Sequence, residues 1–257
     1  MNIFIKAVSH LPAMEIVFFR CGISLVLCLY QLHILKIDWK GSNRKLLLMR
    51  GAFGTLALYL YFITIAKMPL ATAVAIQYLS PIFTTILAIF VLGEKVRPVS
   101  WIFFLISFAG VVVMKDVDDR IELPYLIIGI LSAVVSACAY VTIRSLKAKE
   151  NPLVVVFHFQ LVGTITGFAF TSVNFTMPQG MDWFYLLLVG IFTQLGQLNL
   201  TKALQKDKVA NVSIINYTGI IYAIASGFFI FGEHYGAGTI AGILLVIAGV
   251  LLSMIYR

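Results

Sequence analysis

Residues 69–92 read PLATAVAIQYLSPIFTTILAIFVL, an apolar run without a charged side chain. A helix needs about 20 predominantly apolar residues to cross a bilayer, whereas a membrane barrel strand alternates in polarity over about ten. The run therefore predicts a transmembrane helix. Eight further apolar runs, bounded by charged residues, Pro or Gly, predict eight more spans: 13–35, 46–66, 98–114, 124–146, 153–173, 183–203, 209–231 and 236–256.

The composition places nearly the whole chain in a lipid bilayer. Of its 257 residues, 61% are hydrophobic and only 12% are charged, against roughly 45–50% and about 25% in soluble domains. The spans leave only short connections, which excludes a separate catalytic or nucleic-acid-binding domain. The net charge of +8 is scattered between the apolar runs, so we expect no nucleic-acid partner. Three cysteines inside apolar runs have no metal-ligand spacing, and we expect no metal and no cofactor.

The basic residues predict the orientation. Alternate connections carry 14 Lys and Arg residues on one side of the membrane and 3 on the other. Cytoplasmic loops are enriched in Lys and Arg, so this split predicts a multi-pass protein of the cytoplasmic (inner) membrane with a cytoplasmic C-terminus. The 14 are Lys36, Lys40, Arg44, Lys45, Arg50, Lys95, Arg97, Arg144, Lys147, Lys149, Lys202, Lys206, Lys208 and Arg257; the 3 are Lys67, Lys115 and Arg120.

The two halves of the chain resemble each other. An offset of 139 aligns residues 67–111 with 206–250 without a gap, and Gly93-Glu94 then matches Gly232-Glu233 between two spans. These dipeptides fall on opposite sides of the membrane, so the halves, 1–114 and 124–257, are predicted to be inverted repeats. Such repeats are a recurring design of secondary transporters.

The first repeat lacks most of the helix that begins the second repeat. The second half starts with the full span 124–146, whereas the corresponding helix of the first half would end near Ser9 and can include only about nine residues. We therefore expect an all-α, five-plus-five inverted-repeat bundle whose first helix is largely missing, with both termini of the ten-span protein cytoplasmic. The alternative is a protein that functions with nine helices.

Short motifs carry a family resemblance. Arg50-Gly51, Tyr61-Phe62, Ala66, Pro69 to Ala73, Ser80 to Phe83 and Gly93-Glu94 resemble the EamA-type branch of the drug/metabolite transporter superfamily. The resemblance implies a ten-helix carrier of small organic solutes, with branches that export amino acids or import metabolites such as S-adenosylmethionine. The second half departs from the pattern at Ile220, which stands where the first half has Pro81.

Polar residues near the bilayer midplane predict a central substrate site. Gln77, Ser80 and Pro81 share one helix face beside Tyr78, and Pro81 frees the carbonyl of Gln77 from the helical hydrogen-bond ladder. The repeat partner places three residues at the same depth: Asn216, Tyr217 and Gly219. Interruptions at corresponding positions of two halves point to a transporter's binding site. The alternative is a packing kink at Pro81 and a close helix contact at Gly219.

Other intramembrane polar groups are secondary candidates, because such groups are costly in hydrocarbon. Arg20 is a natural receptor for a substrate carboxylate or phosphate, or else forms an internal ion pair with Glu15. Glu15 is a possible ion-coupling carboxylate, and Lys6 is placed to face it. Gln194 and Gln197 are predicted to line the pathway or to form interhelical hydrogen bonds.

Two acidic residues and two glycine pairs are predicted to be structural. Glu94 and Glu233 each follow a helix end and are expected to bond backbone amides of the next helix. The pairs Gly163/Gly167 and Gly238/Gly242 suit close helix contacts within one subunit or between two. Both a monomer and a homodimer remain open.

The sequence favours a secondary transporter that moves a small organic metabolite, an amino acid or an S-adenosylmethionine-like solute, by alternating access around the midplane site. Its partners are then a small-molecule substrate and the lipid bilayer. One alternative is an accessory membrane subunit for flipping lipid-linked molecules. A membrane-embedded enzyme is disfavoured, since the four histidines form no HExxH motif and no protease arrangement is present, so we expect no catalytic residues.

Overall fold

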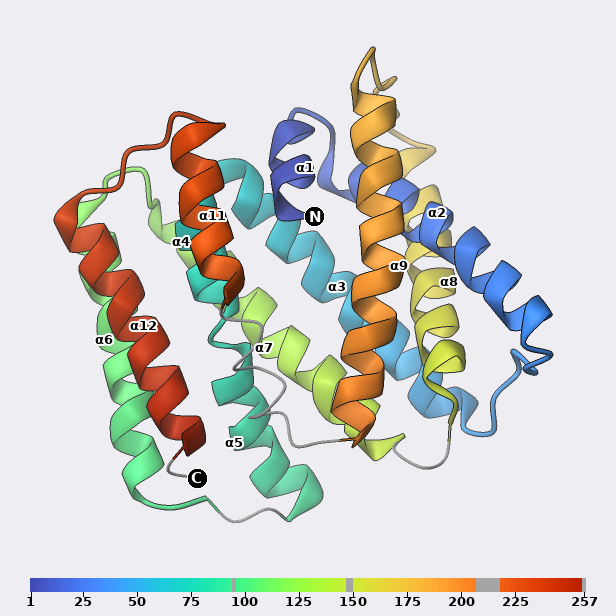
Figure 1. Cartoon of the computed structure of the whole chain (residues 1–257), viewed down its shortest axis with the longest axis horizontal. Helices are drawn as coiled ribbons and strands as arrows, with labels where there is room; N and C mark the ends of the chain where they lie inside the picture. Colours follow the sequence, from blue (N-terminus) through green and yellow to red (C-terminus); the bar gives the residue numbers. More distant parts are fainter. Residues whose placement is uncertain (94–95, 147–149, 207–217, 256–257) are drawn as a thin grey trace.

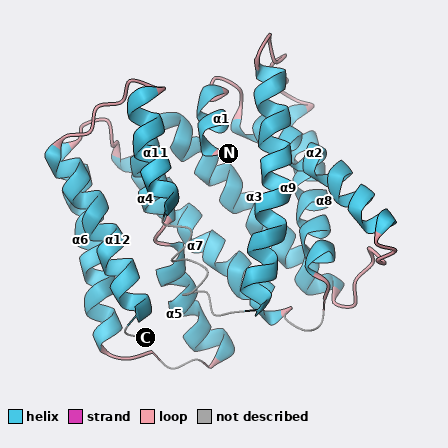
Figure 2. Cartoon of the chain, in the orientation of Figure 1, coloured by secondary structure: helices cyan, strands magenta, loops and turns pink. Residues whose placement is uncertain are grey.

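The computed structural model describes residues 1–93, 96–146, 150–206 and 218–255, and in these ranges the chain consists of helices and loops without strands (Figures 1 and 2). The helices are α1 (Asn2–Ala7), α2 (Ala13–Ile34), α3 (Arg44–Lys67), α4 (Leu70–Gln77), α5 (Ser80–Leu92), α6 (Val99–Val117), α7 (Leu123–Ser145), α8 (Pro152–Thr171), α9 (Asp182–Lys206), α11 (Thr218–Phe229) and α12 (Ala237–Ile255).

The chain is a polytopic helical membrane protein. Seven stretches of the described chain are long and apolar enough to cross a membrane, with α4 and α5 counted together as Leu70–Val91. Two shorter apolar helices, Thr218–Phe229 and Ala237–Ser253, fall inside the predicted spans 209–231 and 236–256. Residues 209–217 of the first of these spans lie outside the described residues. Large exposed apolar side chains such as Val26, Phe90 and Phe229 suit a surface that faces lipid.

Local sequence explains several helix boundaries. The side chains of Asn43 and Asn151 accept hydrogen bonds from the amides of Leu46 and Leu153, which caps the N-termini of α3 and α8. Gly93 ends α5 with a φ of 66° in the left-handed region, where a residue without Cβ is favoured.

The predicted helix 69–92 is two helices, and the single-helix expectation is corrected. α4 ends at Gln77 and α5 starts at Ser80, so Tyr78 and Leu79 form the break. Pro81 lacks an amide hydrogen and cannot bond the carbonyl of Gln77, and its ring disfavours a continuous helix. The proline that suggests a kink in the sequence therefore divides one membrane span, Leu70–Val91, into two helices joined by a turn at Tyr78 and Leu79.

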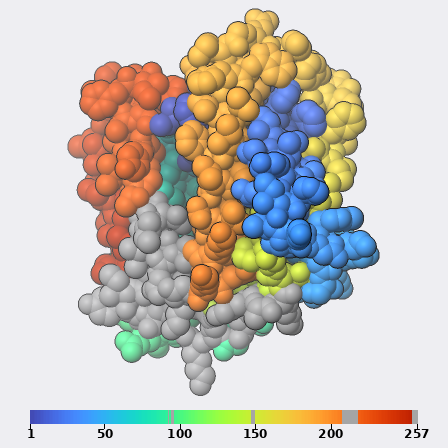
Figure 3. All heavy atoms as spheres, turned by 45° about the vertical axis from the view of Figure 1, so that its right-hand side comes forward, coloured from blue at the N-terminus to red at the C-terminus, as the bar shows by residue number. Residues whose placement is uncertain are grey.

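The helices pack in pairs that join distant parts of the sequence. α6 lies along α12 at one edge of the molecule, and α2 packs against α8 and α9 at the other (Figure 1). α3 packs against α7 and α8. α9 and α2 lie next to each other on the face in Figure 3. The loops α6–α7, α8–α9 and α11–α12 lie at one end of the bundle, called here the upper end after Figure 1.

The predicted glycine pairs make contacts within the chain. A methyl group on Gly242 would lie 2.7 Å from the carbonyl oxygen of Gly110, so only glycine permits the approach of α12 to α6. Gly163 and Gly167 leave room for Cys21 and Phe18 on α2 in the same way. The choice between monomer and homodimer stays a prediction.

Candidate functional site

A cavity of about 270 Å³ opens inside the bundle between α2, α3, α7, α9 and the α4–α5 break. Six of the predicted substrate-binding residues line it: Arg20, Gln77, Tyr78, Ser80, Pro81 and Gln197. The cavity reaches from Tyr61 and the helix break toward Arg50 in the second turn of α3 and Leu204 near the end of α9. It therefore extends from the middle of the bundle toward the lower end.

The helix break forms one wall of the cavity. Tyr78, Ser80 and Pro81 line it, and a methyl group on Gly219 of α11 would collide with the hydroxyl of Tyr78. The small residue at position 219 thus lets α11 approach the break. The remaining predicted residues of this helix, Asn216 and Tyr217, lie outside the described residues.

Gln77 combines a cavity position with interhelical bonds. Its Nε2 donates to Ser136 Oγ at 2.8 Å, and its Oε1 accepts from Ser132 Oγ at 3.0 Å. Both serines belong to α7. The side chain therefore fastens the end of α4 to α7 while one surface of it faces the cavity.

Two buried arginines line the cavity. Arg20 is fully buried, and its one recorded hydrogen bond goes from Nη1 to Cys21 Sγ at 3.6 Å. Arg50 is 3% exposed and donates from Nη2 to Gln197 Oε1 at 3.3 Å. Their guanidinium carbons lie 5.6 Å and 4.2 Å from the centroid of the Phe159 ring.

The ion pair with Glu15, the alternative to substrate binding for Arg20, is absent from the described chain. Glu15 is also buried, but its Oε2 accepts from the amide of Thr176 in the α8–α9 loop at 2.9 Å. It does not line the cavity. Its assignment to ion coupling stays a prediction.

Arg50 was not expected at the site. The charge pattern assigns it to the connection before α3, and the structure corrects this by placing it inside that helix. Gly54, one turn later in α3, is the sequence feature that accompanies this position of Arg50, because its missing side chain leaves room for the guanidinium. A glycine one turn from an arginine inside an apolar run is the pattern that sequence analysis missed.

Gln194 has a different place from Gln197. Its Oε1 accepts from Ser24 Oγ at 2.8 Å and its Nε2 donates to Gln31 Oε1 at 2.9 Å. These bonds tie α9 to α2 away from the cavity lining. The interhelical alternative therefore describes the geometry of Gln194, whereas Gln197 faces the cavity.

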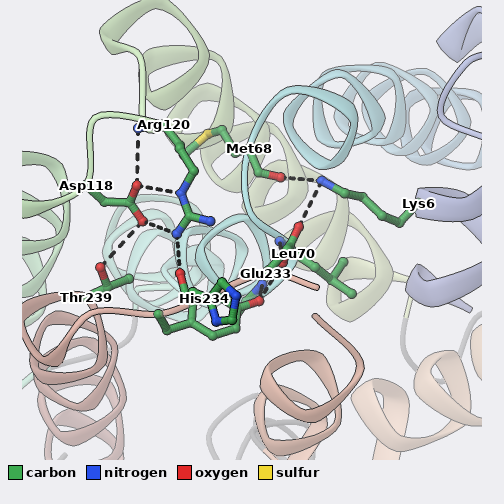
Figure 4. Close-up of polar contacts among 10 residues, drawn as sticks. Lys6, Met68, Leu70, Asp118, Arg120, Glu233, His234 and Thr239 are labelled. Atoms are coloured by element: carbon green, nitrogen blue, oxygen red, sulfur yellow. Dashed lines mark hydrogen bonds and ion pairs between the residues drawn. The ribbon is translucent and has the colours of Figure 1, made fainter. Parts of the chain in front are cut away.

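Glu233 joins three parts of the chain at the upper end (Figure 4). Its Oε2 accepts from the amide of Leu70, the first residue of α4, at 2.8 Å and from the hydroxyl of Tyr235 at 2.6 Å. Its Oε1 lies 3.3 Å from Lys6 Nζ. Burial raises the pKa of Tyr235, so the hydroxyl stays protonated and donates.

These contacts correct two expectations. Glu233 bonds a backbone amide of α4, from the other half of the chain, and not of the following helix. Lys6 pairs with Glu233 and not with Glu15, and it also donates to the carbonyl oxygens of Met68 at 2.6 Å and Ile65 at 2.9 Å. Glu94, the other acidic residue predicted to be structural, lies outside the described residues.

A second cluster ties the loops beside it (Figure 4). Arg120 donates to both carboxylate oxygens of Asp118, at 2.9 Å and 2.8 Å, and to the carbonyl oxygen of His234 at 2.5 Å. The hydrogen bond from Arg120 lowers the pKa of Asp118, which keeps the carboxylate charged. We call the contacts of Lys6, Glu233, Tyr235, Asp118 and Arg120 the upper network. It links α1, α4 and the α6–α7 and α11–α12 loops at the end of the bundle away from Arg50.

A comparison with protein families matches the chain twice. The EamA-like transporter family matches residues 1–115 and 123–255.

Among the described residues, no group of three or more His, Cys, Asp or Glu side chains is placed to hold a metal ion.

Individual relatives are transporters, and two of them are named after different substrates. The chain is 34% identical to the pseudopaline exporter CntI of Pseudomonas aeruginosa, over 98% of this chain and 90% of that protein. It is 25% identical to the S-adenosylmethionine uptake transporter of Rickettsia felis, over 95% and 83%, and 27% identical to human solute carrier family 35 member G1, over 96% and 73%.

A solved crystal structure shares the fold. It superposes with a TM-score of 0.71 at 17% sequence identity, over 100% of this chain and 95% of that one.

Proposed function

Because the chain belongs to the EamA-like transporter family, we propose that it is a secondary transporter that moves a small organic metabolite across the cytoplasmic membrane by alternating access. The membership confirms the family that the motifs predict. The family and the relatives are transporters and not enzymes, in agreement with the sequence. The substrate class is an amino acid or an S-adenosylmethionine-like solute.

The observation that carries this proposal is the cavity at an interrupted helix. Discontinuous helices near the bilayer midplane form the binding sites of many secondary transporters, because broken ends expose backbone groups to a ligand. Here the α4–α5 break lines the cavity with Ser80 and Pro81. The upper network links loops at the end of the bundle away from the cavity, and in the proposed mechanism this end is the closed one and the substrate enters from the lower end.

The packing supports two inverted repeats, 1–114 and 124–257, as the moving units. Helices 139–140 positions apart pair directly, as in α2 with α8 and α6 with α12. In the same repeat, α3 corresponds to α9, α7 to α1 and α8 to α2. The contact of α3 with α7 therefore matches the contact of α9 with α1, and the contact of α3 with α8 matches that of α9 with α2. Two halves related in this way supply inward-open and outward-open states around one site.

The charge distribution supports an assignment of the lower end to the cytoplasm. Without Arg50, which lies in the cavity, the 14 basic residues of that side become 13 against 3. This excess still follows the positive-inside rule and supports a cytoplasmic C-terminus.

Filling the cavity is expected to stop transport without loss of fold. Ala139 lines the cavity on α7, and Ala139→Phe would occupy the substrate's space. We expect its uptake in proteoliposomes to fall about tenfold or more, since 1.4 kcal/mol of lost binding is a factor of ten. The assay measures radiolabelled amino acids and S-adenosylmethionine, one at a time, with protein-free liposomes as the blank.

Leu131→Phe is the matched control, because Leu131 lies on the same helix and is 48% exposed. It is expected to transport like the parent protein. If Ala139→Phe elutes as a folded protein and transports every tested solute at the parent rate, the cavity is not the transport route.

A further inference from the structure

The cavity lining has two positively charged side chains, Arg20 and Arg50, and, among the described residues, no negatively charged side chain to balance them. We propose that its ligand is an organic dianion, such as a dicarboxylate, bound between Arg20 and Arg50. This inference rests on the proposed function, because it names the substrate class of the same cavity: among the proposed solutes it favours an amino acid with two carboxylates over an S-adenosylmethionine-like cation.

Arg50 presents unused donors. Its Nε and Nη1 are buried and have no hydrogen-bond partner in the described structure, while Nη2 reaches Gln197. A guanidinium carries five N–H donors in a planar fork that matches a carboxylate. The guanidinium of Arg50 is therefore held by one neutral amide, that of Gln197, and its Nε and Nη1 remain available to bind a ligand.

Arg20 presents the same deficit. Its Nε and Nη2 lack a described partner, and its contact with Cys21 is a bond to a weak sulfur acceptor. The three acid–base pairs of the described chain involve other residues, namely Lys6, His10 and Arg120. Neither cavity arginine is neutralised there.

The aromatic ring between them does not replace an anion. A cation–π contact with Phe159 contributes about 0.5 to 2 kcal/mol, whereas removing an ion from water costs several kcal/mol even after relaxation. Two like charges near one ring also repel each other. The balance therefore favours a ligand that brings two negative charges, with Phe159 holding both guanidinium planes in place.

A purely structural role explains the arginines less well. An apolar side chain of similar size would fill the same volume without the cost of a buried charge. Gly54 also keeps space clear beside the Arg50 guanidinium and the Phe159 ring. A Cβ at position 54 would collide with both groups, so the glycine is what allows the Arg50 guanidinium to lie beside α3 at the cavity.

The test compares charged and neutral probes of equal shape. Thermal unfolding of the full-length protein in an uncharged detergent is recorded with glutarate, with its diamide glutaramide and with inorganic phosphate, at equal concentration and ionic strength. We expect glutarate to raise the unfolding temperature and glutaramide to leave it unchanged. Protection by phosphate as well supports a compact dianion site, and protection by glutarate alone supports two separated carboxylates.

The variants Arg20→Gln and Arg50→Gln are expected to weaken the apparent glutarate affinity about tenfold or more each, the effect of losing one charge-assisted contact. Arg50→Lys retains the charge and should lose less. Arg97→Gln, at an exposed position, is the control and should respond like the parent protein. Equal protection by glutarate and glutaramide, or glutarate protection that persists in both Gln variants, overturns the dianion proposal.

The outcomes also separate this proposal from the transport proposal. Transport of a neutral or cationic solute without glutarate protection rejects the dianion and leaves the transporter intact. Glutarate protection that depends on both arginines, with no transport of any dianion in proteoliposomes, keeps the binding site and rejects transport.

Discussion

Gly54→Leu is expected to abolish transport. A Cβ at position 54 would lie 2.7 Å from Phe159 Cε2 and would also collide with the Arg50 guanidinium. Even a methyl group requires these two side chains to move, and a leucine would extend into the cavity that they line. We expect uptake of the transported solute to fall by about a hundredfold, since a displacement of about 1 Å at a binding site costs that much.

The measurement is initial uptake into proteoliposomes at matched protein density. Gly196→Leu on α9 is the control, because a Cβ there meets nothing within 4 Å and the residue is exposed. It should transport normally. A Gly54→Leu protein that is folded and as active as the Gly196→Leu protein would contradict the placement of Arg50 and Phe159 at the site.

Glu233→Gln is expected to open the upper end. The substitution keeps a group that accepts from the Leu70 amide but removes the charge that pairs with Lys6. The pair is mostly buried, with side-chain exposures of 15% and 11%, so solvent screens it only partly. Losing it should shift the equilibrium toward the open state by about 1 to 3 kcal/mol, roughly 5- to 150-fold.

Accessibility of a single cysteine introduced at Ser80, which lines the cavity, reports this shift. The background lacks Cys21, Cys28 and Cys138, and a membrane-impermeant maleimide is applied from the upper side. Glu122→Gln is the control, because Glu122 is an exposed acidic residue at the start of α7. If Glu233→Gln labels no faster than Glu122→Gln, the upper network does not hold that end closed.

Sequence alone predicted the features that depend on local chemistry. Apolar length determines where a chain crosses a bilayer, so the apolar runs, including residues 69–92 with Pro81 inside, located the spans. A proline inside a span also has one predictable effect, the loss of a backbone hydrogen bond, which predicted the freed carbonyl of Gln77 but not the division of the span into α4 and α5. The two glycine pairs were identified because close helix contacts need small residues.

The remaining features depend on which helices meet. Arg50 was counted with the charges of the connection that includes Arg44 and Lys45, and its position beside Phe159 of α8 in the cavity becomes visible only in the fold. The partner of Glu233 lies 163 positions away at Leu70. Gln194 and Gln197 are equivalent by composition, and their separate roles come from facing α2 and α3 respectively.

Two-sided labelling of the cysteine at Ser80 tests the central claim, alternating access to one cavity, most directly. In inside-out and right-side-out vesicles, we predict rapid labelling from the cytoplasmic side of the parent background and slow labelling from the outside. Glu233→Gln should reverse this preference while the cavity stays accessible from one side at a time. Equal labelling from both sides in both proteins, or labelling from neither, would contradict the account.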